Sequence, residues 1–134
     1  MIGIFLVTHG SLGESLIQCA CHVLNKRPPL LAQLGVSAQD DPLDILPTAR
    51  RWLELVDGGR GVLVLTDVFG ATPSNIAMKL LQPGRHEVIA GANLPMLLRA
   101  LTYREKDMQT LVAKALLGGR DGILHVKTER DANA

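Results

Sequence analysis

Residues 2–15 read IGIFLVTHGSLGES, and this segment begins with a nearly continuous apolar run. Such a run is typical of a strand that is buried on both faces of a parallel sheet. The run ends in Thr8, His9 and Gly10, and a polar turn containing glycine follows. Ligands of open α/β sheets bind beyond the carboxyl ends of the strands. His9 is therefore a candidate reactive residue.

The pattern after this turn predicts a helix and then a regular alternation of strands and helices. Ser11 and Glu14 are spaced as in a capping box, and the first helix should end before Pro28 and Pro29. We expect further strands at 30–36, 61–66, 87–90 and 122–126, and further helices at 42–56, 72–81, 94–103 and 108–117. Trp52 is expected on the buried face of its helix. This order predicts an α/β fold with a mostly parallel sheet.

Composition narrows the function classes. The chain has 134 residues, 47% of them hydrophobic and 3% aromatic, which suits one domain with helices packed on a sheet. The 14 basic and 13 acidic residues are mixed along the chain, so neither a nucleic-acid face nor a membrane surface is expected. No apolar segment is long enough to span a bilayer, and no signal peptide is expected. Cys19 and Cys21, the two cysteines, favour a reducing, cytoplasmic setting.

His9 and Asp67 are the residues most suited to chemistry. Each follows a predicted strand, so the two side chains meet if the first and third strands are neighbours. A carboxylate bound to one imidazole nitrogen fixes the tautomer and leaves the other nitrogen as a nucleophile or base. The turns after both strands would also direct N–H groups toward an anion such as phosphate. A structural role for His9 remains the alternative, because a lone histidine beside a strand end is often structural.

Other possible sites have less support. Cys19, Cys21 and His22 lie on one predicted helix, where residues two apart point about 200° apart and cannot share a metal ion. His86 and His125 have no suitably spaced partner, so we interpret them as structural. The chain lacks the P-loop, G-x-G-x-x-G and G-x-S-x-G motifs. Nothing in the sequence requires a metal or a cofactor.

Three segments in order carry a family resemblance: VTHGSLGESL at 7–16, GVLVLTDVFGATPSN at 61–75 and EVIAGANLPMLLRAL at 87–101. They resemble the enzyme IIA component of the mannose family of the bacterial phosphoenolpyruvate-dependent sugar phosphotransferase system (PTS). The resemblance covers residues 2 to about 126, which implies one domain at 1–126 and a polar tail at 127–134. The family fold is a doubly wound α/β sheet with helices on both faces. Its dimer exchanges the last strand, which would here be 122–126.

The resemblance also implies a reaction and its residues. His9 would accept a phosphoryl group from phospho-HPr at its Nε2 (tele) nitrogen, and Asp67 would orient the ring. The phosphate pocket would comprise Gly10, Ser11, Gly70, Ala71 and Thr72. Transfer would then proceed to an enzyme IIB protein, which we expect to be separate because this chain ends in a charged tail.

Two positions depart from the family pattern. Many relatives have Trp and a second Gly where this chain has Phe69 and Ala71, so we expect slightly altered partner contacts with the chemistry retained. An exposed apolar rim that includes Phe69 and Met96 is expected for transient docking.

Two alternatives to sugar transport stay open. A regulatory protein could use the same phosphorylation of His9 without moving any sugar. The phosphoryl-relay subunit of a dihydroxyacetone kinase ranks lower, because its loop after the aspartate differs from DVFGATPSN.

Overall fold

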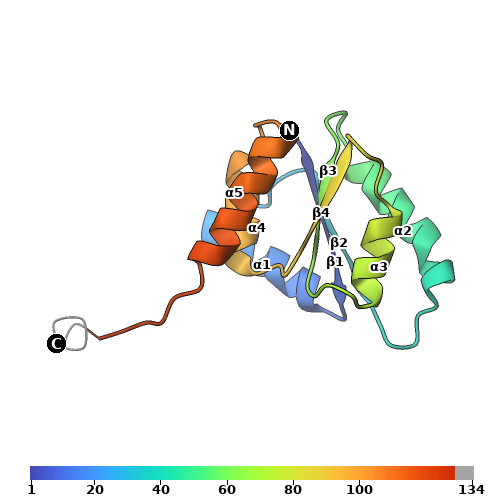
Figure 1. Cartoon of the computed structure of the whole chain (residues 1–134), viewed down its shortest axis with the longest axis horizontal. Helices are drawn as coiled ribbons and strands as arrows, with labels where there is room; N and C mark the ends of the chain where they lie inside the picture. Colours follow the sequence, from blue (N-terminus) through green and yellow to red (C-terminus); the bar gives the residue numbers. More distant parts are fainter. Residues whose placement is uncertain (129–134) are drawn as a thin grey trace.

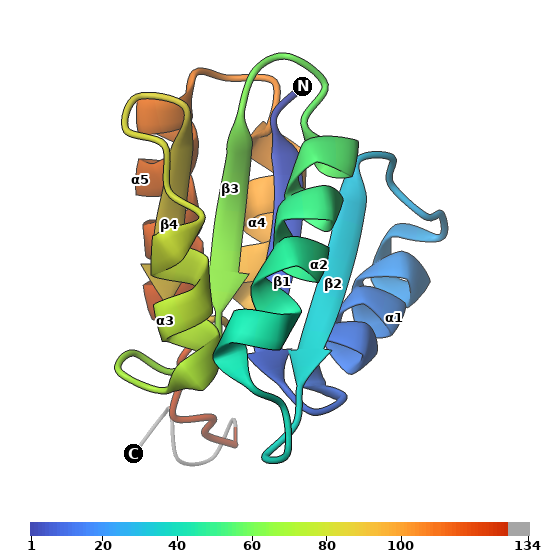
Figure 2. The same cartoon turned by 90° about the vertical axis from the view of Figure 1, so that its right-hand side faces the viewer.

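A four-stranded parallel sheet forms the centre of the molecule. The structure, a computed structural model, describes residues 1–128. The strands are β1 (Gly3–His9), β2 (Leu31–Val36), β3 (Val62–Thr66) and β4 (His86–Ala90), in the order β2-β1-β3-β4 (Figure 2). All three pairings are parallel. The apolar runs at 2–7 and 62–65 thus become the two central strands, which are covered on both faces.

Five helices cover both faces of this sheet. They are α1 (Leu12–Leu24), α2 (Pro42–Val56), α3 (Thr72–Lys79), α4 (Leu94–Tyr103) and α5 (Met108–Asp121). One apolar core joins the sheet to α1, α4 and α5, and the other joins it to α2 and α3 (Figure 1). The predicted α/β class with helices on both faces is confirmed. None of these five helices has the length and apolar character needed to cross a bilayer.

The carboxyl-terminal part of the chain differs from the expectation. Helix α5 continues through Gly118 and Gly119, where the sequence suggested a stop. Both glycines permit close packing on α4, because an added Cβ at Gly119 would lie 2.8 Å from the Met96 Cε atom. Within the described residues, the segment 123–128 forms no strand and leads away from the body (Figure 1). The strand expected at 122–126 is therefore absent from this single chain, and the remaining tail lies largely outside the described residues.

The structure also corrects the prediction for Trp52. Its side chain lies on the exposed side of α2, because Ala49, Leu53 and Val56 form the buried stripe of that helix.

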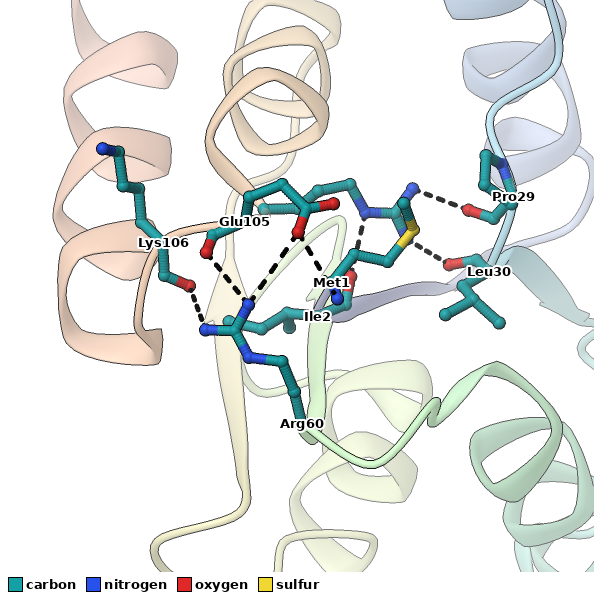
Figure 3. Close-up of polar contacts among 8 residues, drawn as sticks. Met1, Ile2, Pro29, Leu30, Arg60, Glu105 and Lys106 are labelled. Carbon is teal, nitrogen blue, oxygen red and sulfur yellow. Dashed lines mark hydrogen bonds and ion pairs between the residues drawn. The ribbon is translucent and has the colours of Figure 1, made fainter.

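At the amino-terminal ends of the strands, opposite to His9, arginine side chains bind backbone carbonyl groups, among them those of Pro29 and Leu30, which Figure 3 labels. Arg104 is only 4% exposed, and it donates hydrogen bonds to the carbonyl oxygens of Ile2, Pro29 and Leu30. These bonds connect the end of α4 to the start of β1 and to the turn before β2. Arg60 donates to the carbonyl oxygens of Glu105 and Lys106 nearby. The amino-terminal ends of the strands, opposite to His9, are thus fixed by hydrogen bonds from arginine side chains to backbone carbonyl oxygens.

Candidate functional site

His9 and Asp67 meet at the carboxyl edge of the two central strands. Because β1 and β3 are adjacent, the residue after Thr66 reaches the end of β1. The Nδ1 atom of His9 lies 2.8 Å from Oδ2 of Asp67, and the backbone N–H of His9 donates to the same oxygen at 3.0 Å. The other carboxylate oxygen accepts from the backbone N–H of Val68 at 3.0 Å. Hydrogen bonds to both carboxylate oxygens therefore fix the side chain of Asp67.

This geometry sets the protonation of the imidazole. An ionised carboxylate can only accept, so Nδ1 carries the hydrogen and Nε2 keeps its lone pair. The His9 side chain is 54% exposed, whereas that of Asp67 is 12% exposed. The ring is therefore oriented from the protein side and accessible from solvent, as an attacking nucleophile must be.

The charge on Asp67 is stabilised by the same contacts. Burial raises the pKa of Asp67, but the hydrogen bonds from the backbone N–H and the ring of His9 outweigh it and lower the pKa below 3.8. Asp67 is thus ionised at neutral pH and can stabilise a positive charge on the imidazole.

The two helices that follow the central strands begin differently from the other three. Helices α2, α4 and α5 are capped by the side chains of Asp41, Asn93 and Asp107. Within residues 1–128, neither α1 nor α3 has a side-chain cap at its own N-cap residue. Backbone N–H groups at uncapped helix starts favour anions. The uncapped starts follow the strands that lead to His9 and Asp67.

The capping box predicted for Ser11 and Glu14 is wrong. Ser11 occupies the N-cap position, but its side chain makes no capping bond within the described chain. Instead, the N–H of Gly13 donates to the hydroxyl oxygen of Thr8, on β1, at 2.8 Å. The sequence motif could not reveal this, because the competing acceptor comes from the strand.

Glycines shape both turns of the site. Gly10 and Gly70 have φ angles of 52° and 88°, which favour glycine. Gly35 on β2 lets the turn after β1 approach closely, since a Cβ there would collide with the carbonyl oxygen of Gly10. Sequence reasoning missed Gly35, although a glycine inside a strand is a known signal of close backbone approach.

The predicted phosphate residues follow the two strands that lead to His9 and Asp67. Gly10 and Ser11 are exposed in the turn after β1, while Gly70, Ala71 and Thr72 lie in the turn after Asp67 and at the start of α3. Their role toward phosphate stays a prediction.

The apolar rim is only partly as expected. Phe69 is 74% exposed, and Val68 and Leu12 are exposed too. Met96 is wrong as a rim residue, because it is 4% exposed and packs in the α4–α5 core.

The remaining candidates do not form a second centre. His86 is buried, and its Nδ1 accepts from the N–H of Val62 at 3.2 Å, which agrees with a structural role. In the part of the chain that the structure describes, no three His, Cys, Asp or Glu residues are grouped as metal ligands. A hollow of about 400 Å³, lined in part by Arg50, Asp57 and Arg85, does not include His9. The His9 side chain itself is exposed at the surface.

The chain matches known proteins over most of its length. Residues 3–116 match the family EIIA-man, described as the PTS system fructose IIA component. The chain is 31% identical over 131 residues to the PTS system mannose-specific EIIAB component of Escherichia coli (strain K12), covering 96% of this chain and 40% of that protein. It is equally similar to the component of the same name from Shigella flexneri. The chain thus spans about 40% of the length of these curated relatives.

Solved structures share the fold. The phosphotransferase system component EIIA from Streptococcus agalactiae superposes with a TM-score of 0.82 at 25% identity, covering 93% of this chain and 97% of that one. The mannose/sorbose specific IIA subunit from Enterococcus faecalis gives a TM-score of 0.84 at 22% identity, covering 95% and 96%.

Proposed function

The chain belongs to the EIIA-man family of PTS IIA components, and on that premise we propose that it carries a phosphoryl group on His9. The observation that supports this most is the bond between Nδ1 of His9 and Asp67, which leaves the Nε2 lone pair of an exposed ring free, close in sequence to the starts of α1 and α3. The proposed donor is the phosphohistidine of HPr, and the proposed acceptor is a IIB protein.

The proposed transfer exchanges one N–P bond for another. Nε2 of His9 attacks phosphorus in line while the N–P bond of the donor histidine breaks, and the donor imidazole leaves with the electron pair. The hydrogen on Nδ1 stays between the ring and Asp67, so the phosphorylated imidazole is cationic and faces a carboxylate. Onward transfer repeats the exchange with His9 as the leaving group. Neither step consumes a cofactor.

Charge stabilisation would come from the turns around the site. The phosphoryl oxygens spread negative charge during a loose transition state, and preorganised donors stabilise it most. The proposed donors are the first N–H groups of α3, those of α1 other than the N–H of Gly13, which Thr8 binds, and the hydroxyls of Ser11 and Thr72. Ala71, the N-cap residue of α3, could contribute only its backbone N–H, because its side chain is a methyl group.

An exposed apolar rim fits protein partners. Leu12, Val68 and Phe69 are exposed and lie within three residues of His9 or Asp67 in the sequence, and transient complexes bury small, partly apolar surfaces. HPr and IIB would then use the same face in turn. A homodimer that exchanges 122–126, a domain at 1–126 and a cytoplasmic location all stay predictions.

Reconstitution with purified components tests the proposal. The chain is incubated with phosphoenolpyruvate, enzyme I and HPr, and its intact mass is measured under alkaline conditions that preserve phosphohistidine. We expect a gain of one phosphoryl group that is acid-labile and requires HPr. His22→Ala, on the exposed part of α1, serves as the matched control for His9→Ala. Phosphorylation that persists in His9→Ala would refute the assignment.

The second step separates transport from regulation. Adding a IIB protein to the phosphorylated chain should move the label to IIB and return the chain to its original mass. Retention of the label with every IIB protein tested would favour the regulatory alternative.

A further inference from the structure

Thr8 occupies an unusual place beside the reactive histidine. It is the residue before His9 on β1, it is fully buried, and it lies on the β1 face opposite to Val7. Its hydroxyl oxygen accepts the N–H of Gly13 at 2.8 Å. Gly13 is the second residue of α1, so this is the bond that an N-cap side chain normally makes. A side chain of β1 thus accepts the N–H that an N-cap side chain of α1 would normally accept.

Because Thr8 accepts the N–H of Gly13, the side chain of Ser11, the N-cap residue, makes no capping bond within the described chain. The N–H of Ser15 donates to the carbonyl oxygen of Ser11, which places Ser11 at the N-cap position. However, the backbone of Ser11 has φ −98° and ψ 8°, which is not the extended conformation of a capping residue. Its hydroxyl stays exposed at the turn, two residues from His9.

We propose that Thr8 is a positioning residue: it caps α1 from the strand and thereby keeps the Ser11 hydroxyl available for the phosphoryl group on His9. The proposal rests on the proposed function of His9 and adds a role that no family resemblance assigned. Thr8 does not touch the phosphoryl group and acts only through Ser11 and the turn.

The packing around Gly13 permits the bond from its N–H to the Thr8 hydroxyl. A Cβ added to Gly13 would lie 2.9 Å from the Thr8 hydroxyl oxygen and 3.3 Å from Cβ of Gln33 on β2. Glycine therefore lets the first turn of α1 approach the sheet closely enough for the bond. Any larger residue would push the helix start, and with it the turn after His9, outward.

Removing the Thr8 hydroxyl leaves the buried N–H of Gly13 without its acceptor. In Thr8→Val the shape is kept, but the N–H of Gly13 has no acceptor on the strand. We take the Ser11 hydroxyl as the replacement acceptor, which requires Ser11 to turn to the extended capping conformation. Ser11 would then be withdrawn from the phosphoryl group, and the backbone after His9 would shift. The competing acceptor is the buried Oε1 atom of Gln33 on β2, which has no hydrogen-bond partner within residues 1–128 and lies 3.4 Å from the Cβ position of Gly13.

A double-mutant cycle tests the coupling. One hydrogen bond to a charged group corresponds to about a tenfold change in rate or more, so we expect Thr8→Val and Ser11→Ala each to slow phosphorylation by phospho-HPr about tenfold. The loss should appear in kcat, with KM for phospho-HPr changed by less than about twofold. In the Ser11→Ala background, Thr8→Val should add less than about twofold. Thr8→Ser should restore the rate.

Several outcomes would overturn the proposal. Effects of Thr8→Val and Ser11→Ala that multiply would show that Thr8 acts independently of Ser11. A Thr8→Val variant with a lowered unfolding temperature but an unchanged rate would make Thr8 merely structural. If Thr8→Val fails to fold, Thr8→Ala replaces it, because it also removes the hydroxyl that accepts the N–H of Gly13.

A structural readout separates this proposal from the proposed function. Should the wild-type chain accept no phosphate, the function of His9 fails, and the crystal structure of Thr8→Val still decides the capping relation. We expect the Ser11 hydroxyl within hydrogen-bond distance of the N–H of Gly13. An unmoved Ser11 would refute the proposal whatever the activity.

Discussion

Replacing Asp67 with Asn tests how the site prepares the imidazole. Asp67 uses one carboxylate oxygen to accept both the Nδ1–H and the backbone N–H of His9, at 2.8 and 3.0 Å. An Asn side chain keeps the shape but loses the charge, and its amide can donate to Nδ1. Nε2 would then carry the hydrogen and could not attack phosphorus.

The size of the effect follows from these bonds. A hydrogen bond to a charged group contributes about 1.5–3 kcal/mol, which corresponds to roughly 10–150-fold in rate. We expect phosphorylation of Asp67→Asn by phospho-HPr to slow within that range. The free energy of unfolding should fall by only about 1 kcal/mol, because the Asn oxygen can still accept from Val68 or from the His9 backbone.

Single-turnover transfer from phospho-HPr, followed by intact mass, measures the rate. The ¹⁵N chemical shifts of His9 report the tautomer, and we expect hydrogen on Nδ1 in the wild type and on Nε2 in the variant. Asp40→Asn is the matched control, because Asp40 is also an aspartate that accepts a backbone N–H, that of Ser37, at 2.7 Å. A rate for Asp67→Asn within twofold of the control would refute the orienting role.

Three further predictions concern stability and pH. Arg104→Lys replaces three donor nitrogens of a planar group by one, so it cannot keep all three carbonyl bonds in place, although the Leu30 carbonyl retains the N–H of Ile4. Urea unfolding should show a loss of about 1–3 kcal/mol. The exposed control Arg51→Lys on α2 should lose less than about 0.5 kcal/mol. Burial raises the pKa of Asp57, but hydrogen bonds from two backbone N–H groups and Arg85 lower it below 3.8. Its stabilisation is therefore complete above pH 3.8 and lost as the pH falls through the lowered value, so the unfolding free energies of wild type and Asp57→Asn should converge in acid. Burial lowers the pKa of His86 below 6.5, so NMR titration should give a midpoint below 6.5, and the stability contribution of His86 should decline as the pH falls below 6.5.

The central strands and the pairing of His9 with Asp67 could be predicted because their signals are local. The apolar runs before His9 and Asp67 are long enough to require burial on both faces, and the strand order then brings their ends together. The geometry agrees with the expected pairing of these two residues.

The errors arise where a distant part of the chain competes with a local motif. Ser11 and Glu14 have the spacing of a capping box, but the hydroxyl of Thr8 takes the helix donor instead. Gly118 and Gly119 have the composition of a helix end, yet they allow α5 to pack on α4. The segment 122–126 has strand-like composition, but a strand requires a neighbour, and the described chain offers it none.

The Arg104 clamp also bears on how the chain folds during synthesis. The bond from Arg104 to the carbonyl oxygen of Ile2 joins residues 102 positions apart, and β1 also needs β2 and β3 on either side. Of the strands in the described chain, β1 is synthesised first, yet its bond to Arg104 forms only after α4. Long-range contacts of this kind slow folding and leave apolar segments exposed in the meantime. The strand that leads to His9 should therefore lack its bond to Arg104 until α4 has been synthesised.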